Sequence, residues 1–122
     1  MTLRPALLFA AFPNYLLSDA ELFNGQDMTE DGIPDFLRAK GGGIAEATLA
    51  TLNGEADAAE IISESASYWN ISARYLLTLL QKEQSLITTE SPTRRQYDWA
   101  TGFGVCDDCS KSDPAIQKYK GF

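Results

Sequence analysis

Apolar residues recur at helical spacing through much of the chain, and the clearest run lies between residues 72 and 87. Its apolar positions repeat at intervals of three, one and seven residues, as expected for a helix with one apolar face: Leu76, Leu79, Leu80 and Ile87. Ser72 precedes the run and is a favourable N-cap. The pattern therefore predicts a helix over 72–87, called the central helix below, around which the other elements pack.

Two further helices are predicted from the spacing of a capping box, in which an N-cap side chain and an acidic residue three positions later bond to the first turn. Ser18 and Glu21 have this spacing and predict a short helix that begins after Ser18. Asp57 and Glu60 have it as well and predict a helix over about 58–68. The short connection to the central helix makes these two helices antiparallel neighbours.

Proline and glycine limit three more helices. Pro34 is tolerated only near the first turn of a helix, so one helix is expected to begin at 29–31 and to end at the glycines of 41–43. Serine and proline begin a helix expected over 91–102, and Asp113 with the proline after it begins the last one.

The segment 44–52 is rich in alanine and only weakly patterned, and we expect it to be helical, with a turn at Asn53 and Gly54. No segment shows a convincing alternation of apolar and polar residues, which is the pattern of a half-buried strand. The predicted fold class is therefore all-α, a small helical domain over residues 13–122.

The first twelve residues form a separate segment. Arg4 is followed by an apolar run over 6–12, and Pro13 ends it. This composition resembles a short or clipped signal-peptide core and suggests an exported protein. The alternative is a segment that packs on the domain.

Composition restricts the possible partners. The chain has 122 residues and a formal net charge of −7, so it forms one domain at most and is not suited to bind a nucleic-acid backbone. No run approaches the roughly 18 to 20 apolar residues of a membrane span. Residues 1–70 carry 3 basic and 11 acidic side chains, whereas residues 71–122 carry 7 and 6. The half with the central helix is thus almost neutral.

The chain contains no histidine. This excludes Ser-His-Asp and Cys-His hydrolysis and removes the commonest metal ligand. Acid–base chemistry must then use carboxylates, tyrosines or lysines, and we expect neither a metal nor a cofactor.

Glu83 is the candidate for such chemistry. It follows Leu80 by three residues and precedes Ile87 by four, which places it on the apolar stripe of the central helix. Burial and the carbonyls at the end of a helix both disfavour a negative charge, and a carboxyl group kept neutral in this way can act as a general acid. The alternative is a glutamate at the helix end that turns to water.

Two other groups of residues remain open to a structural or a functional explanation. Cys106 and Cys109 form one CxxC pair, too few ligands for tetrahedral zinc, and predict a local disulfide in an exported protein or a reduced pair otherwise. Tyr97, Trp99 and Phe103 form an aromatic cluster that suits either stacking on sugar rings or core packing.

The segment 83–86, Glu-Gln-Ser-Leu, resembles the catalytic motif of the lysozyme-like lytic transglycosylases of the SLT type. In that family the catalytic glutamate ends a helix, a serine follows within two residues, and a glycine motif lining the sugar cleft comes almost twenty residues later. The glycines at 102 and 104 stand at that distance. The strings around 81–86, 99–104 and 119–122 are also similar to a group of bacterial cell-envelope proteins.

This resemblance implies a lysozyme-like helical domain, secreted or in the bacterial cell envelope, that binds the peptidoglycan glycan strand. It implies that Glu83 cleaves the β-1,4 glycosidic bond as general acid and base, as a lytic transglycosylase or a muramidase. Ser85 would orient Glu83, and three residues would shape the sugar site: Tyr97, Gly102 and Phe103.

The sequence also departs from the family pattern. Phe103 and the glycine after it replace the Leu-Met-Gln part of the second motif, so its substrate-binding glutamine cannot be assigned here. A later tyrosine-containing helix of the family has no counterpart before residue 122, which predicts a domain incomplete at its C-terminus. Hydrolysis by the usual schemes needs a second carboxylate, for which Glu90 and Asp98 are the nearby candidates, whereas transglycosylation needs one. The alternative function is a non-catalytic glycan-binding or envelope-interaction domain.

Overall fold

The computed structural model describes residues 17–103, 108–110 and 112–122. The predicted segment 1–12 lies outside them. The described part contains short α-helices, one 3₁₀ helix and one β-hairpin, in the following order: α2 (Asp19–Leu22), α3 (Gly32–Lys40), η1 (Gly43–Glu46), β1 (Thr48–Thr51), β2 (Gly54–Asp57), α4 (Ala58–Trp69), α5 (Ala73–Gln84), α6 (Arg94–Asp98) and α7 (Pro114–Gln117).

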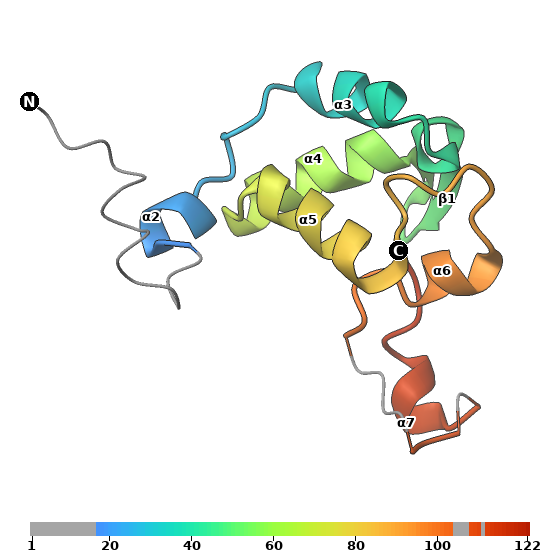
Figure 1. Ribbon diagram of the computed structural model, residues 1–122. Helices are drawn as coiled ribbons and strands as arrows, with labels where there is room; N and C mark the ends of the chain where they lie inside the picture. The colour runs from blue at the N-terminus through green and yellow to red at the C-terminus, as the bar shows by residue number, and fades with distance from the viewer. Residues whose placement is uncertain (1–16, 104–107, 111) are drawn as a thin grey trace, which may run out of the picture.

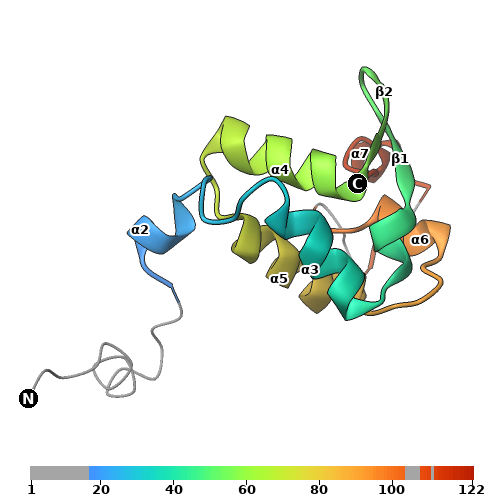
Figure 2. The same cartoon turned by 90° about the horizontal axis from the view of Figure 1, so that it is seen from above.

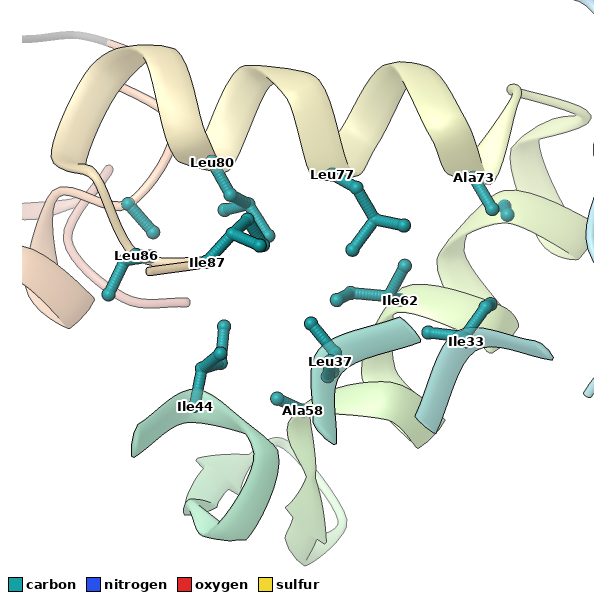
Figure 3. Close-up of a cluster of buried hydrophobic side chains, with 12 residues drawn as sticks. Ile33, Leu37, Ile44, Ala58, Ile62, Ala73, Leu77, Leu80, Leu86 and Ile87 are labelled. Atoms are coloured by element: carbon teal, nitrogen blue, oxygen red, sulfur yellow. The ribbon is translucent and has the colours of Figure 1, made fainter. Parts of the chain in front are cut away.

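The core lies between α3, α4, α5 and η1 (Figures 1 and 3). Helices α4 and α5 lie side by side and run in opposite directions, as predicted (Figures 1 and 2). From α5 the core receives Ala73, Leu77 and Leu80, which are spaced by four and three residues and so share one face. After α5 ends, Leu86 and Ile87 also point into the core (Figure 3).

The first turns of the helices confirm several predicted caps. The side chain of Ser18 accepts a hydrogen bond from the backbone N–H of Glu21, and the side chain of Glu21 returns one to the backbone of Ser18, which completes the capping box of α2. Asp57 accepts a bond from the backbone of Glu60 at the start of α4, and Ser72 caps α5. Local sequence chemistry therefore determines where these helices begin.

The sequence predicted the start of α7 correctly and the start of α6 only approximately. Helix α6 begins two residues later than the Ser-Pro pair suggested, because Thr93 and Gln96 form a complete capping box. Helix α7 begins as predicted, with Asp113 as its cap and a proline in its first turn.

The prediction of an all-α fold is wrong, because the segment 48–51, expected to be helical, forms the first strand of a β-hairpin. Strand β1 pairs with β2 in antiparallel register, with Thr48 opposite Asp57 and Thr51 opposite Gly54. Each strand contributes a single half-buried residue, and these two form the cross-strand pair Leu49 and Ala56. A strand with one inward side chain has no alternation to detect, so the pattern of apolar residues could not reveal it. The hairpin turns at Leu52 and Asn53, one residue before the predicted turn at Asn53 and Gly54, and Gly54 begins β2.

The domain is thus a small mixed one, mostly helical, with the hairpin beside the start of α4 (Figure 2). Across the part of the chain that the structure describes, the helices are too short or too polar to cross a membrane.

Candidate functional site

Glu83 lies in the last turn of α5, two residues before the C-cap residue Ser85. The buried face of the helix is formed by Ala73, Leu77 and Leu80, and Glu83 stands beside this face rather than on it. Its side chain keeps 31% of its surface exposed. The expectation that Glu83 occupies the core-facing stripe is therefore wrong. The carboxylate lies at the rim of the core, where solvent and a ligand can reach it.

Gly102 lies directly against the carboxylate. A Cβ atom built on residue 102 would stand 2.6 Å from Oε2 of Glu83, closer than real Cβ contacts occur. The backbone of Gly102 also has a φ of 68°, a left-handed conformation that side chains disfavour. The backbone conformation therefore favours glycine here, and a side chain at residue 102 would displace the Glu83 carboxylate from its position.

Hydrogen bonds hold the Gly102 turn against the end of α5. The carbonyl oxygen of Trp99 accepts a bond from the backbone N–H of Gly102 at 3.0 Å and another from Nε2 of Gln84 at 3.1 Å. Nε2 of Gln96 in turn donates to the carbonyl oxygen of Gln84 at 2.8 Å, which satisfies one of the free carbonyls at the helix end. Two glutamine side chains thus fix the position of Gly102 relative to Glu83.

Lys82 is a neighbour of Glu83 that the sequence analysis missed. Its Nζ donates to Oε1 of Glu83 at 3.1 Å. Consecutive residues on a helix point about 100° apart, so their sequence positions gave no reason to expect this contact. One carboxylate oxygen therefore faces a cation, while the other faces the backbone of Gly102.

Ser85 is placed close to Glu83 in the chain but does not bond to it. It adopts a left-handed conformation with a φ of 54° and ends the helix. Its carbonyl oxygen accepts bonds from the backbone and the hydroxyl of Thr89. Among the described residues, no hydrogen bond joins its hydroxyl to Glu83. Its observed contribution is to turn the chain from α5 towards residues 86–89.

The two predicted aromatic residues are placed differently. Phe103 follows Gly102 and is 68% exposed, and its ring meets that of Tyr119 edge to face at 5.1 Å between centroids. Tyr97 packs against the core and against Phe122, and this burial raises the pKa of its phenol above the usual 10.0. Phe103 is thus available to a ligand next to Gly102, whereas Tyr97 is half-buried and packs against the core.

The remaining candidates are a second carboxylate and the cysteines. Asp98 forms ion pairs with Lys120 at 3.4 Å and with Arg94 at 3.8 Å, so its charge is already used to hold the C-terminal segment. Cys109 is disulfide-bonded. Cys106 lies outside the described residues.

At this site the partly exposed carboxylate of Glu83 lies between the Lys82 cation and the backbone turn at Gly102. The exposed rings of Phe103 and Tyr119 lie against each other beside this turn. The carboxylate can exchange a proton with a bound ligand or accept its hydrogen bonds, and aromatic faces suit sugar rings. Within the described ranges, no cluster of three or more side chains has the composition to hold a metal ion.

Comparison with known proteins identifies one family. No curated protein and no solved structure matches the chain significantly. The family model described as LasA, N-terminal domain, matches residues 15–108, which include α2 to α6 and thus Glu83 and Gly102. LasA is a secreted bacterial protein, and the match concerns its family rather than the lytic transglycosylases. The chain belongs to the LasA N-terminal domain family.

Proposed function

We propose that this domain acts on bacterial peptidoglycan and cleaves its β-1,4 glycosidic bond with Glu83 as general acid and base. The observation that carries the proposal is the close approach of Glu83 to Gly102. The absence of a side chain at residue 102 leaves room for the carboxylate in this position. A carboxylate that acts on a bound sugar needs a fixed position and an open side.

The surroundings of Glu83 support this role. The local motif around it resembles that of lytic transglycosylases, and the glycine expected almost twenty residues later is the one that contacts it. The family is consistent with a cell-wall target, since LasA is a secreted staphylococcolytic protease. In the proposed reaction, Glu83 protonates the leaving oxygen while the bond to the sugar carbon breaks.

A scheme with one carboxylate fits these residues best. Asp98 forms ion pairs with Lys120 and Arg94 that hold the C-terminal segment, which gives this carboxylate a structural role of its own. After the first step the Glu83 carboxylate would take a proton from the 6-hydroxyl of the same sugar. That hydroxyl oxygen then bonds to the anomeric carbon and gives an anhydro product, so neither water nor a second carboxylate is consumed.

The second candidate is a glycan-binding domain without turnover. Two observations favour it: Lys82 engages one of the two oxygens of Glu83, and Phe103 and Tyr119 expose a pair of rings that could stack on sugars. Binding by stacking requires no proton transfer.

Digestion of purified peptidoglycan, followed by mass analysis of the released muropeptides, tests both functions. We expect anhydro ends from the wild type and no release from Glu83→Gln. Reducing ends would indicate a hydrolase that uses a further carboxylate. Sedimentation of the protein with peptidoglycan without any release would indicate the binding domain and contradict the enzyme.

A further inference from the structure

A groove of about 730 Å³ lies between α3 and α5. Its floor is apolar: Leu77 and Ile87 belong to the core, and Met28 and Phe36 pack against it. The volume is within the range of roughly 300–1,000 Å³ that small-ligand sites occupy. The groove is thus large enough and apolar enough to hold a ligand.

The rim of the groove is basic. Lys40, Arg74 and Lys82 line it, and no carboxylate side chain is among its lining residues, although the chain as a whole carries a net charge of −7. In the described part of the chain, neither Lys40 nor Arg74 forms an ion pair. The Nζ of Lys40 instead lies 5.4 Å from the centre of the Phe36 ring. A complementary ligand would therefore combine apolar groups with negative charges.

Lys82 connects this groove to the candidate catalytic carboxylate. It lines the groove, and its Nζ contacts Oε1 of Glu83 at 3.1 Å. A substrate held at Glu83 could thus extend a branch past Lys82 into the groove. Arg74 lies eight residues before Lys82 on the same helix, so the two cations are separated by about 12 Å along its axis.

We propose that this groove binds the peptide stem of peptidoglycan, while the glycan that bears it lies at Glu83. The stem carries small apolar side chains and free carboxylates, which match the floor and the rim. Four residues in extended form span about 13 to 14 Å, close to the separation of Arg74 and Lys82. The link to Glu83 rests on the proposed function, but binding of the peptide to the groove can be measured without any turnover.

The test titrates the full chain with a soluble stem tetrapeptide that lacks sugar, followed by NMR. We expect shifts confined to residues that line the groove, and affinity that falls with added salt because charges contribute to it. Arg74→Ala and Lys40→Ala should each weaken binding by about threefold or more, whereas Arg95→Ala, an exposed cation of α6 outside the groove, should leave it unchanged. Amidation of the peptide carboxylates should weaken binding to the wild type by about tenfold.

Several results would overturn the proposal. These are an absence of binding, equal binding of the amidated peptide, unchanged affinity of Arg74→Ala and Lys40→Ala, or shifts located outside the groove. Complete displacement of the peptide by a simple fatty acid at equal concentration would also contradict it, since the groove would then select an acyl chain. Peptide binding retained by a protein that digests no peptidoglycan would support this site and reject only the proposed enzymatic function.

Discussion

Helix α5 has a carboxylate at each end, and the two ends differ in what the carboxylate does. At the N-terminal end Asp27 accepts hydrogen bonds from the hydroxyl of Ser72 and, at 2.9 Å, from the backbone N–H of Ala73. At the C-terminal end Glu83 contacts Lys82 and the backbone of Gly102 and keeps 31% of its side-chain surface exposed. Asp27 thus caps the start of the helix, whereas the carboxylate of Glu83 remains accessible.

The difference follows from the polarity of the helix. The free N–H groups at an N-terminus attract a negative charge, so Asp27 satisfies the backbone and is stabilised by it. The free carbonyls at a C-terminus offer Glu83 no donor, and the bonds that satisfy them come from elsewhere, as from Gln96. The Glu83 carboxylate is therefore not needed to satisfy the helix end and is available to bind or react with a ligand. This difference between Asp27 and Glu83 can be tested by mutation at both ends of α5.

The largest effect is expected at the C-terminal end, on activity. Glu83→Gln should reduce the release of muropeptides by about 10² to 10⁴-fold, because an amide cannot act as a general acid. Its free energy of unfolding should stay within about 0.5 kcal/mol of the wild type, since only an exposed ion pair is lost. Digestion assays and urea unfolding measure the two quantities. A stability loss comparable to that of a core mutation would assign Glu83 a structural role.

Gly102→Ala is expected to have the next largest effect. Its Cβ would collide with the Glu83 carboxylate and would also strain a backbone whose φ is 68°. Gly41→Ala is the matched control, because Gly41 has a φ of 75° and no atom within 4 Å of an added Cβ. Both variants should cost about 1 kcal/mol from backbone strain, because the end of the Glu83 side chain can move away from the new Cβ, but only Gly102→Ala should lose digestion. Unchanged digestion by Gly102→Ala would mean that the position of the Glu83 carboxylate against residue 102 is not important.

The N-terminal end is probed by Asp27→Ala. Loss of the bonds to Ser72 and Ala73 should lower the free energy of unfolding by about 1 to 2 kcal/mol. Asp31→Ala is the control, since Asp31 is the N-cap residue of α3 but makes no side-chain capping bond, and it should change stability by less than about 0.5 kcal/mol. At a temperature where Asp27→Ala remains folded, we expect it to keep its digestion activity, because Asp27 stabilises the fold and does not act on the substrate. Loss of digestion by the folded variant would contradict this difference between the two ends of α5.

The smallest effect concerns Tyr97, which belongs to α6 and packs near the C-terminal end of α5. Burial raises the pKa of its phenol above 10.0 in the folded state. Below pH 10 the phenol is neutral whether the chain is folded or unfolded, but at higher pH the unfolded chain loses the proton first, so stability falls. Tyr97→Phe should reduce this alkaline loss of stability, measured by thermal unfolding between pH 9 and pH 11. An identical alkaline slope in the variant would show that Tyr97 does not cause it.

Much of the helical part could be predicted from the sequence because its determinants are local. Ser18, Asp57, Ser72 and Asp113 each act on the backbone of the next one to three residues, so the start of a helix is encoded within a few positions. The all-α prediction failed at 48–57 for a corresponding reason, since hairpin pairing joins residues whose side chains remain mostly exposed. Apart from the turn signal at Asn53 and Gly54, the local pattern of apolar and polar residues contains no information on such a pairing.

The sequence by itself identified Glu83 at the end of a helix and a glycine nineteen residues later. Only the tertiary structure brought the two into contact, because their approach depends on bonds from Gln84 and Gln96 that join two helices. The tertiary structure also decided that Glu83 stands beside the core rather than in it. The predicted stripe included Ile87, which lies beyond the end of α5, and it was rotated relative to the face that is buried. Helical periodicity alone cannot say which of two adjacent faces of a helix will be buried.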